Sequence, residues 1–256
     1  MGEITATLYE YCEAWPLARS TEDLDIFLRT EILANSEQVI SFRESLESLG
    51  YKVLEQSKYF QFTDGAVVID LLTGPIEPRL RNRIKVRNFR AGSTVANLQL
   101  HAHITEEALS LEHALTEIRI DGILSTGERH TAAILIPNSF TFLLMKLHAF
   151  FDQVDKQDKQ FGKHHASDIY RIVAMMTEQD FNLTNELIET HKNAPACQHA
   201  SVIAETCFKK SDAIGILRLK AHESYSDNMK VDEFREILLT LFAPVRKSQE
   251  PSNHLS

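Results

Sequence analysis

The sequence predicts an α/β fold in the first half of the chain and an all-helical second half. Residues 19–74 contain a strand, a helix and a strand meander in succession, which indicates a mixed sheet with helices packed on it. From Asn138 onward, apolar residues recur at the i, i+3, i+4 and i+7 spacing of a helix. Pro137 separates the two patterns. We therefore expect domains at 1–136 and 137–246, followed by a polar, disordered tail at 247–256.

The first half begins with a strand from about Asp23, followed by a helix. This helix is predicted to begin at Asn35-Ser36-Glu37 and to continue through Leu49, and Gly50 ends it. Its apolar side comprises Val39, Ile40, Phe42, Leu46 and Leu49.

A strand meander follows this helix. Short strands are predicted at 51–55 and 58–63, and the Asp64-Gly65 turn signal joins the second of them to a buried strand at 66–72. The remainder of the first half looks strand-rich, with one short helix capped by Thr105.

The second half is predicted to contain only helices. The first has an apolar stripe of Phe140, Leu143, Leu144, Leu147, Phe150, Phe151 and Val154. The second has Ile169, Ile172, Val173 and Met176 on one side. Further helices are expected at about 183–192, 196–222 and 229–243.

Composition narrows the classes of function. Hydrophobic residues make up 43% of the 256 and charged residues 25%, as in an ordinary globular protein. No window approaches the ~18 apolar residues of a membrane span, so no membrane partner is expected. Residues 1–7 lack the features of a secretory signal, and three cysteines are too few for a disulfide framework, so we expect a cytoplasmic protein.

A local cluster of cations contrasts with the net charge of −9, which argues against an extended nucleic-acid-binding surface. Five cations occupy every second position and would share one face of a strand: Arg79, Arg81, Arg83, Lys85 and Arg87. Such a face suits phosphate docking, for example of RNA. Alternatively, these cations discourage the pairing of an exposed strand edge.

Two carboxylates open the first strand. Asp23 and Asp25 lie two positions apart, so they point to the same side of a strand, with Cα atoms roughly 6.5–7 Å apart. Carboxylates at that separation can converge on one or two Mg²⁺ ions. Alternatively, they are an ordinary solvated strand end.

Asp70 strengthens the interpretation that Asp23 and Asp25 bind Mg²⁺. It lies within the apolar 66–72 strand, where burial of an unpaired carboxylate is costly. A metal ion shared with Asp23 and Asp25 would compensate its charge, and one of the three carboxylates could activate an attacking hydroxyl. Alternatively, Asp70 caps the following turn.

Polar residues of the second half offer further candidates. Lys146 lies at the edge of an apolar stripe, where its ammonium could face a cleft and neutralise a triphosphate, or simply reach solvent. His164, His165 and Asp168 can share one helix side. A polar cluster at a helix N-terminus explains them better than a metal site, because no further ligand is near in the sequence. His101 and His103 are a weak zinc signal.

These segments together resemble the AbiEii-like nucleotidyltransferases, a family of minimal nucleotidyltransferase-fold proteins that includes toxins of toxin–antitoxin pairs. The residues from Arg19 to Asp25 match its R-x-T-x-D-hydrophobic-D, and 68–72 match its third-carboxylate strand. The family's P-x-x-hydrophobic…K-L-x-A helix is matched by Ile136-Pro137 together with residues 146–149. Its second polar helix is matched by residues 165–169. The resemblance covers roughly 19–178.

The resemblance implies a nucleotidyltransferase-like mixed sheet and Mg²⁺-dependent transfer of a nucleotide from an NTP to a hydroxyl acceptor. Asp23, Asp25 and Asp70 would hold Mg²⁺, with Asp70 as the base. Nucleotide-binding residues would be Arg19, Thr21, Lys146 and Asp168. Some members act on tRNA ends, so RNA on the basic strand and a cognate antitoxin would be partners.

Two departures from the family leave a second hypothesis open. The family's Gly-Gly-Ser phosphate turn has no counterpart at 8–15, which hold no glycine and two glutamates. His164 and His165 replace the usual Arg-Asp, and Phe151 and Gln153 stand where arginine is expected. The chain could therefore be a non-catalytic member that binds nucleotide, RNA or a partner protein. A third hypothesis, an unrelated α/β interaction domain, predicts that Asp70 lies far from Asp23 and Asp25.

Overall fold

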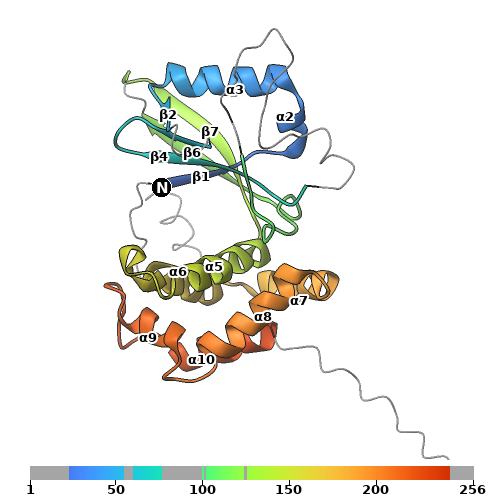
Figure 1. Ribbon diagram of the computed structural model, residues 1–256, viewed down its shortest axis with the longest axis vertical. Helices are drawn as coiled ribbons and strands as arrows, with labels where there is room; N and C mark the ends of the chain where they lie inside the picture. Colours follow the sequence, from blue (N-terminus) through green and yellow to red (C-terminus); the bar gives the residue numbers. More distant parts are fainter. Residues whose placement is uncertain (1–22, 55–59, 77–99, 101, 124–125, 243–256) are drawn as a thin grey trace, which may run out of the picture. The chain divides into compact units, whose positions relative to one another are not determined.

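The computed structural model describes residues 23–54, 60–76, 100, 102–123 and 126–242 (Figure 1). It is a mixed α/β protein whose strands include both parallel and antiparallel pairs, as predicted. The chain divides into two compact units, with the boundary between Pro137 and Asn138. We call the described residues up to Pro137 the N-terminal unit and residues 138–242 the C-terminal unit, and describe each by itself.

Strand β4 (Val68–Thr73) is the centre of the main sheet. It pairs in parallel with β1 (Asp23–Phe27) along one edge. Its other edge is shared by β3 (Gln61–Thr63), which is antiparallel to it, and β5 (His103–Ile104), which is parallel. The short β2 (Lys52–Val53) extends the sheet beyond β3. Alternating burial along β4 places Ile69 and Leu71 on the core side.

Two helices cover that core side of the sheet. Helix α2 (Thr30–Ala34) is followed by α3 (Ser36–Ser48), which lies along one side of the strands in Figure 1. Asn35 caps α3 by accepting hydrogen bonds from the N–H groups of Glu37 and Gln38. The core joins the helices to the sheet through Leu28, Leu33, Val39, Leu46, Phe62, Ile69 and Leu71.

The prediction that Leu49 belongs to the apolar side of α3 is wrong. Leu49 is the C-cap residue and its side chain is 71% exposed. Gly50 follows with a φ of +89°, a conformation that glycine adopts without steric cost, and it turns the chain away from the helix axis.

The predicted hairpin between β3 and β4 is confirmed. The Asp64 carboxylate accepts hydrogen bonds from the N–H groups of Ala66 and Val67, which lower the pKa of this carboxyl. Gly65 has a φ of +98°, which the turn requires.

A second sheet of the N-terminal unit is an antiparallel ribbon of β6 (Thr116–Ile123) and β7 (Arg129–Ile136). The helix predicted after Thr105 is wrong, because the N–H of Ala108 closes a single turn on the Thr105 carbonyl and the pattern does not continue. The basic stretch at 79–87 lies outside the described residues, as does the tail at 247–256.

The C-terminal unit is helical throughout, as predicted. Its elements are α5 (Ser139–Gln153), the 3-10 segment η2 (Gln157–Gly162), α6 (Lys163–Ala174), α7 (Glu178–His191), α8 (Pro195–Phe208), α9 (Ile214–Lys220) and α10 (Val231–Leu241). None of the described helices is both long and apolar enough to cross a membrane.

Helix α5 is the centre of this unit and contacts α6, α7 and α8. Asn138 caps it by accepting the N–H of Thr141. Five residues of the predicted stripe are fully buried: Phe140, Leu143, Leu144, Leu147 and Phe150. Phe151 is not part of the core, since it is 41% exposed and its ring lies edge-on to His199.

The continuous helix predicted over 196–222 is wrong. Helix α8 ends at Phe208 and α9 starts at Ile214, so the chain turns between them. The periodicity continues through both helices because each buries an apolar side, and hydrophobic spacing does not reveal a change of axis.

Candidate functional site

The pairing of β1 with β4 brings the three predicted carboxylates together. Asp25 lies directly opposite Asp70 in the parallel register, and Asp23 lies opposite Val68. Adjacent strands are about 4.8 Å apart, and neighbours across a sheet share a face. Because Ile69 and Leu71 occupy the core face, Asp70 points to the opposite face, as do Asp23 and Asp25.

The carboxylates differ in their surroundings. Asp23 and Asp25 are exposed, whereas Asp70 is half-buried. Burial raises the pKa of Asp70, the hydrogen bond from the Gln61 side chain lowers it, and the negative charge of Asp23 raises it again. The net effect is a raised pKa for Asp70. The effect of Asp23 shows that the two carboxylates interact through space.

Oxygen Oδ1 of Asp70 is buried and has no hydrogen-bond partner among the described residues. An unsatisfied buried oxygen is costly unless another group compensates it. Carboxylate oxygens are the ligands that Mg²⁺ prefers. The three carboxylates share one face, but among the described residues they do not form a group of ligand atoms within 4.8 Å of one another, so binding one ion requires their side chains to rotate towards each other. The side chains of Asp23 and Asp25 are reached by solvent.

Two further polar residues border Asp70, and sequence reasoning missed them. Gln61 lies opposite Asp70 on β3 and hydrogen-bonds its carboxyl group. His103 on β5 pairs with Leu72, so it lies on the Asp70 face, and its charge lowers the pKa of Asp70. A two-residue turn at Asp64-Gly65 would have paired Gln61 with Val68; the loop in fact spans 64–67, and this longer loop sets the register that brings Gln61 to Asp70. Nothing local in the sequence indicates that His103 reaches β4.

Lys146 and Asp168, both predicted to bind nucleotide, form an ion pair within the C-terminal unit. The Nζ of Lys146 lies 3.0 Å from Oδ2 of Asp168, and the side chains are 27% and 13% exposed. Arg171 approaches the other oxygen, with Nη1 at 3.7 Å. Asp168 therefore holds two cations at the contact of α5 with α6. Arg19 and Thr21 lie outside the described residues.

We expect Asp168→Asn to lower the free energy of unfolding by about 1–3 kcal/mol, because the amide removes the negative charge that pairs with two partly buried cations, Lys146 and Arg171. Thermal unfolding measures this as a fall of roughly 2–4 °C in Tm for each kcal/mol. The matched control is Glu189→Gln, which removes an exposed ion pair with Lys192 (62% and 43% exposed) and is expected to cost below about 1 kcal/mol. Equal losses in the two variants would contradict a special role for Asp168.

His164 has neighbours with metal-ligating types of side chain that the sequence did not indicate. Its Nδ1 lies 3.0 Å from Nε2 of His222, and Glu223 is adjacent. The expectation that no further ligand lies nearby is therefore wrong, because residues 58 positions apart meet where α9 ends against α6. His101 is outside the described residues, so the His101–His103 pair stays a prediction.

Comparisons of this chain with protein-family models, with curated proteins and with solved structures give no match.

Proposed function

We propose that this protein is a Mg²⁺-dependent nucleotidyltransferase that transfers a nucleotide from an NTP to a hydroxyl acceptor. The observation that carries the proposal is the parallel register of β1 and β4, which aligns Asp23, Asp25 and Asp70 on one face of the sheet. The third hypothesis, an unrelated domain, expects these residues to be far apart. The resemblance to AbiEii-like nucleotidyltransferases supports the same activity.

The three carboxylates would hold Mg²⁺ between them. Bound there, the ion would neutralise the charge of the triphosphate and orient its α-phosphate. Asp70 is the proposed base, since a carboxyl with a raised pKa accepts a proton better than an ordinary one. Gln61 holds the Asp70 carboxyl in place through its hydrogen bond.

In the proposed reaction, the acceptor oxygen forms a bond to the α-phosphorus of the NTP. Its proton passes to the Asp70 carboxylate. The bond from the α-phosphorus to the bridging oxygen breaks, and pyrophosphate leaves with that electron pair. The negative charges of Asp23 and Asp25 disfavour a bare triphosphate, so substrate binding requires the cation.

Our proposals for the acceptor and the partners rest on the sequence. Arg79, Arg81, Arg83, Lys85 and Arg87 suit a phosphate backbone, so we propose RNA such as tRNA as acceptor. The resemblance adds a cognate antitoxin as partner and a toxin role for this chain.

We expect label transfer from an α-³²P NTP to a total tRNA pool in the presence of Mg²⁺, and none in EDTA. Asp23→Ala should abolish the transfer, because it removes a proposed Mg²⁺ ligand and leaves the core side of the sheet intact. The control is Glu44→Gln, an exposed change on α3 at the other face, which should retain full activity.

Failure of transfer with every NTP by the folded protein would contradict the proposal. Calorimetric titration with Mg²⁺ and NTP then distinguishes the second hypothesis. Binding without product would support a non-catalytic member that recognises nucleotide.

A further inference from the structure

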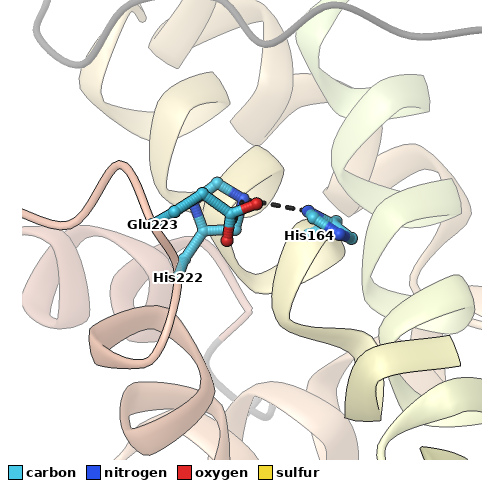
Figure 2. A group of neighbouring side chains, drawn as sticks. All are labelled: His164, His222 and Glu223. Atoms are coloured by element: carbon cyan, nitrogen blue, oxygen red, sulfur yellow. Dashed lines mark hydrogen bonds and ion pairs between the residues drawn. The ribbon is translucent and has the colours of Figure 1, made fainter.

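The C-terminal unit contains a cluster of two imidazoles and a carboxylate (Figure 2). Their nearest ligand atoms, Nδ1 of His164, Nε2 of His222 and a carboxylate oxygen of Glu223, all lie within 4.8 Å of one another. Figure 2 shows the side chains facing each other from the start of α6 and from the turn after α9. We propose that His164, His222 and Glu223 bind a transition-metal ion of the Zn²⁺ class, independently of the Mg²⁺ site proposed above.

The separations fit such an ion. Ligand atoms about 2.1 Å from a tetrahedral zinc are roughly 3.4 Å from one another. The two nitrogens are 3.0 Å apart, and Nε2 of His222 is 4.0 Å from Oε2 of Glu223. Against that spacing the first separation is about 0.4 Å too short and the second about 0.6 Å too long. The third pair, His164 with Glu223, lies within 4.8 Å, so inserting the ion needs small rotations of the side chains.

The donor set favours zinc over magnesium. Two imidazole nitrogens and one carboxylate form a ligand set of zinc sites that keep a fourth position for water, whereas Mg²⁺ takes oxygen ligands almost exclusively. His222 is buried, with a side chain 2% exposed, and Glu223 is 63% exposed. The ion would thus lie at the rim of the unit and be reached from solvent.

Ser224 supports the His222 ring. Its backbone N–H donates to Nδ1 of His222 at 3.2 Å, so Nε2 carries the ring proton and donates to His164. When Nε2 binds an ion, the ring proton must lie on Nδ1, where the Ser224 hydroxyl at 2.6 Å accepts it. Metal-bound histidines usually donate their second N–H in this way. The backbone N–H of Ser224 gives up its acceptor in this state.

Lys163 opposes metal binding. Its Nζ lies 2.9 Å from Oε2 of Glu223, and this hydrogen bond is the largest of several effects that together lower the pKa of the Glu223 carboxyl to about 2. The carboxylate is therefore ionised, but its oxygen is shared with an ammonium that also repels a cation. Removing this ammonium should strengthen zinc binding, an effect that a misfolded variant would not show.

The experiment is a calorimetric titration of the chelator-treated full chain, without a polyhistidine tag, with ZnCl₂. We expect one zinc ion per chain at this site, an affinity at least about 10-fold weaker in His164→Gln and in Glu223→Gln, and a tighter affinity in Lys163→Met. Zinc should also raise the Tm of the wild type, because the ion joins α6 to the turn after α9.

The control is His199→Gln. The rings of His199 and His148 lie 5.0 Å apart, but they form no three-ligand group with a carboxylate among the described residues, so zinc affinity should not change. Circular dichroism without zinc checks that each variant is folded. Absence of zinc binding, or titrations that are the same in the wild type, His164→Gln and Lys163→Met, would overturn the proposal.

Discussion

Asp70→Asn should reduce nucleotide transfer by about 10³-fold or more while making the protein more stable at neutral pH. The loss of activity follows from the proposed role of Asp70, since an amide neither accepts the proton nor supplies an anionic oxygen to Mg²⁺. The gain in stability follows from the burial of the carboxylate and its repulsion by Asp23, both of which raise its pKa. The amide oxygen still accepts the hydrogen bond from Gln61.

The pH dependence of this stability gain has a defined sign. The pKa of Asp70 is higher in the folded protein than its unfolded value of about 3.9. At a pH between these two pKa values the folded protein therefore binds more protons than the unfolded chain. The contribution of Asp70 to stability falls as the pH rises through this range. The Tm difference between Asp70→Asn and the wild type should be near zero at a pH below the unfolded-state pKa of Asp70. It should reach its maximum at a pH above the folded-state pKa.

Thermal unfolding from pH 3 to pH 8 measures this difference, with a rise of roughly 2–4 °C for each kcal/mol gained. Mg²⁺ should raise the Tm of the wild type but not that of Asp70→Asn. Glu44→Gln, on the other face, should change neither activity nor the Mg²⁺ response. A lower Tm for Asp70→Asn at neutral pH, or retention of its activity, would contradict the proposed site.

Gly215→Ala should destabilise the C-terminal unit by about 1–3 kcal/mol or more. A Cβ at this position would lie 2.5 Å from a ring carbon of Phe208 and 2.6 Å from the carbonyl oxygen of Cys207. Phe208 is fully buried against Phe150 and Phe234, so its ring cannot move aside cheaply. The helical preference of alanine over glycine, at most about 1 kcal/mol, offsets only part of this cost because residue 215 lies in the first turn of α9.

Chemical denaturation of the purified chain measures the effect. The matched control is Gly122→Ala on β6, where an added Cβ would meet nothing within 4 Å, so stability should hold or rise slightly. If Gly215→Ala is as stable as the wild type, the close approach of α8 and α9 at this residue is wrong.

Much of the fold follows from local sequence patterns. The apolar stripe of α5 identified its core residues, since a helix without special constraints buries one side. The Asp64-Gly65 turn located the hairpin of β3 and β4, because the turn is held by hydrogen bonds among neighbouring residues, 63–67. Local patterns gave wrong predictions where packing against neighbouring elements decides the structure. They missed the break between α8 and α9, and they placed the exposed residues Leu49 and Phe151 on buried helix sides.

The candidate site, too, was predicted from the sequence only in those features that depend on local patterns. The spacing of Asp23 and Asp25 places them on one side of a strand, and an aspartate within the apolar 66–72 segment signals an unusual burial. Which strands are adjacent depends on long-range pairing, and only that pairing brings Gln61 and His103 to the Asp70 face.

Local sequence patterns predict the order of the α/β and helical parts, the positions of most helices and the shared side of Asp23 and Asp25. These features depend on contacts a few residues apart along the chain. Long-range packing places Asp70 opposite Asp25, pairs Lys146 with Asp168, and brings His164 to His222 and Glu223. Such contacts join distant residues and are stabilised by the burial of the elements that carry them, which no local pattern encodes.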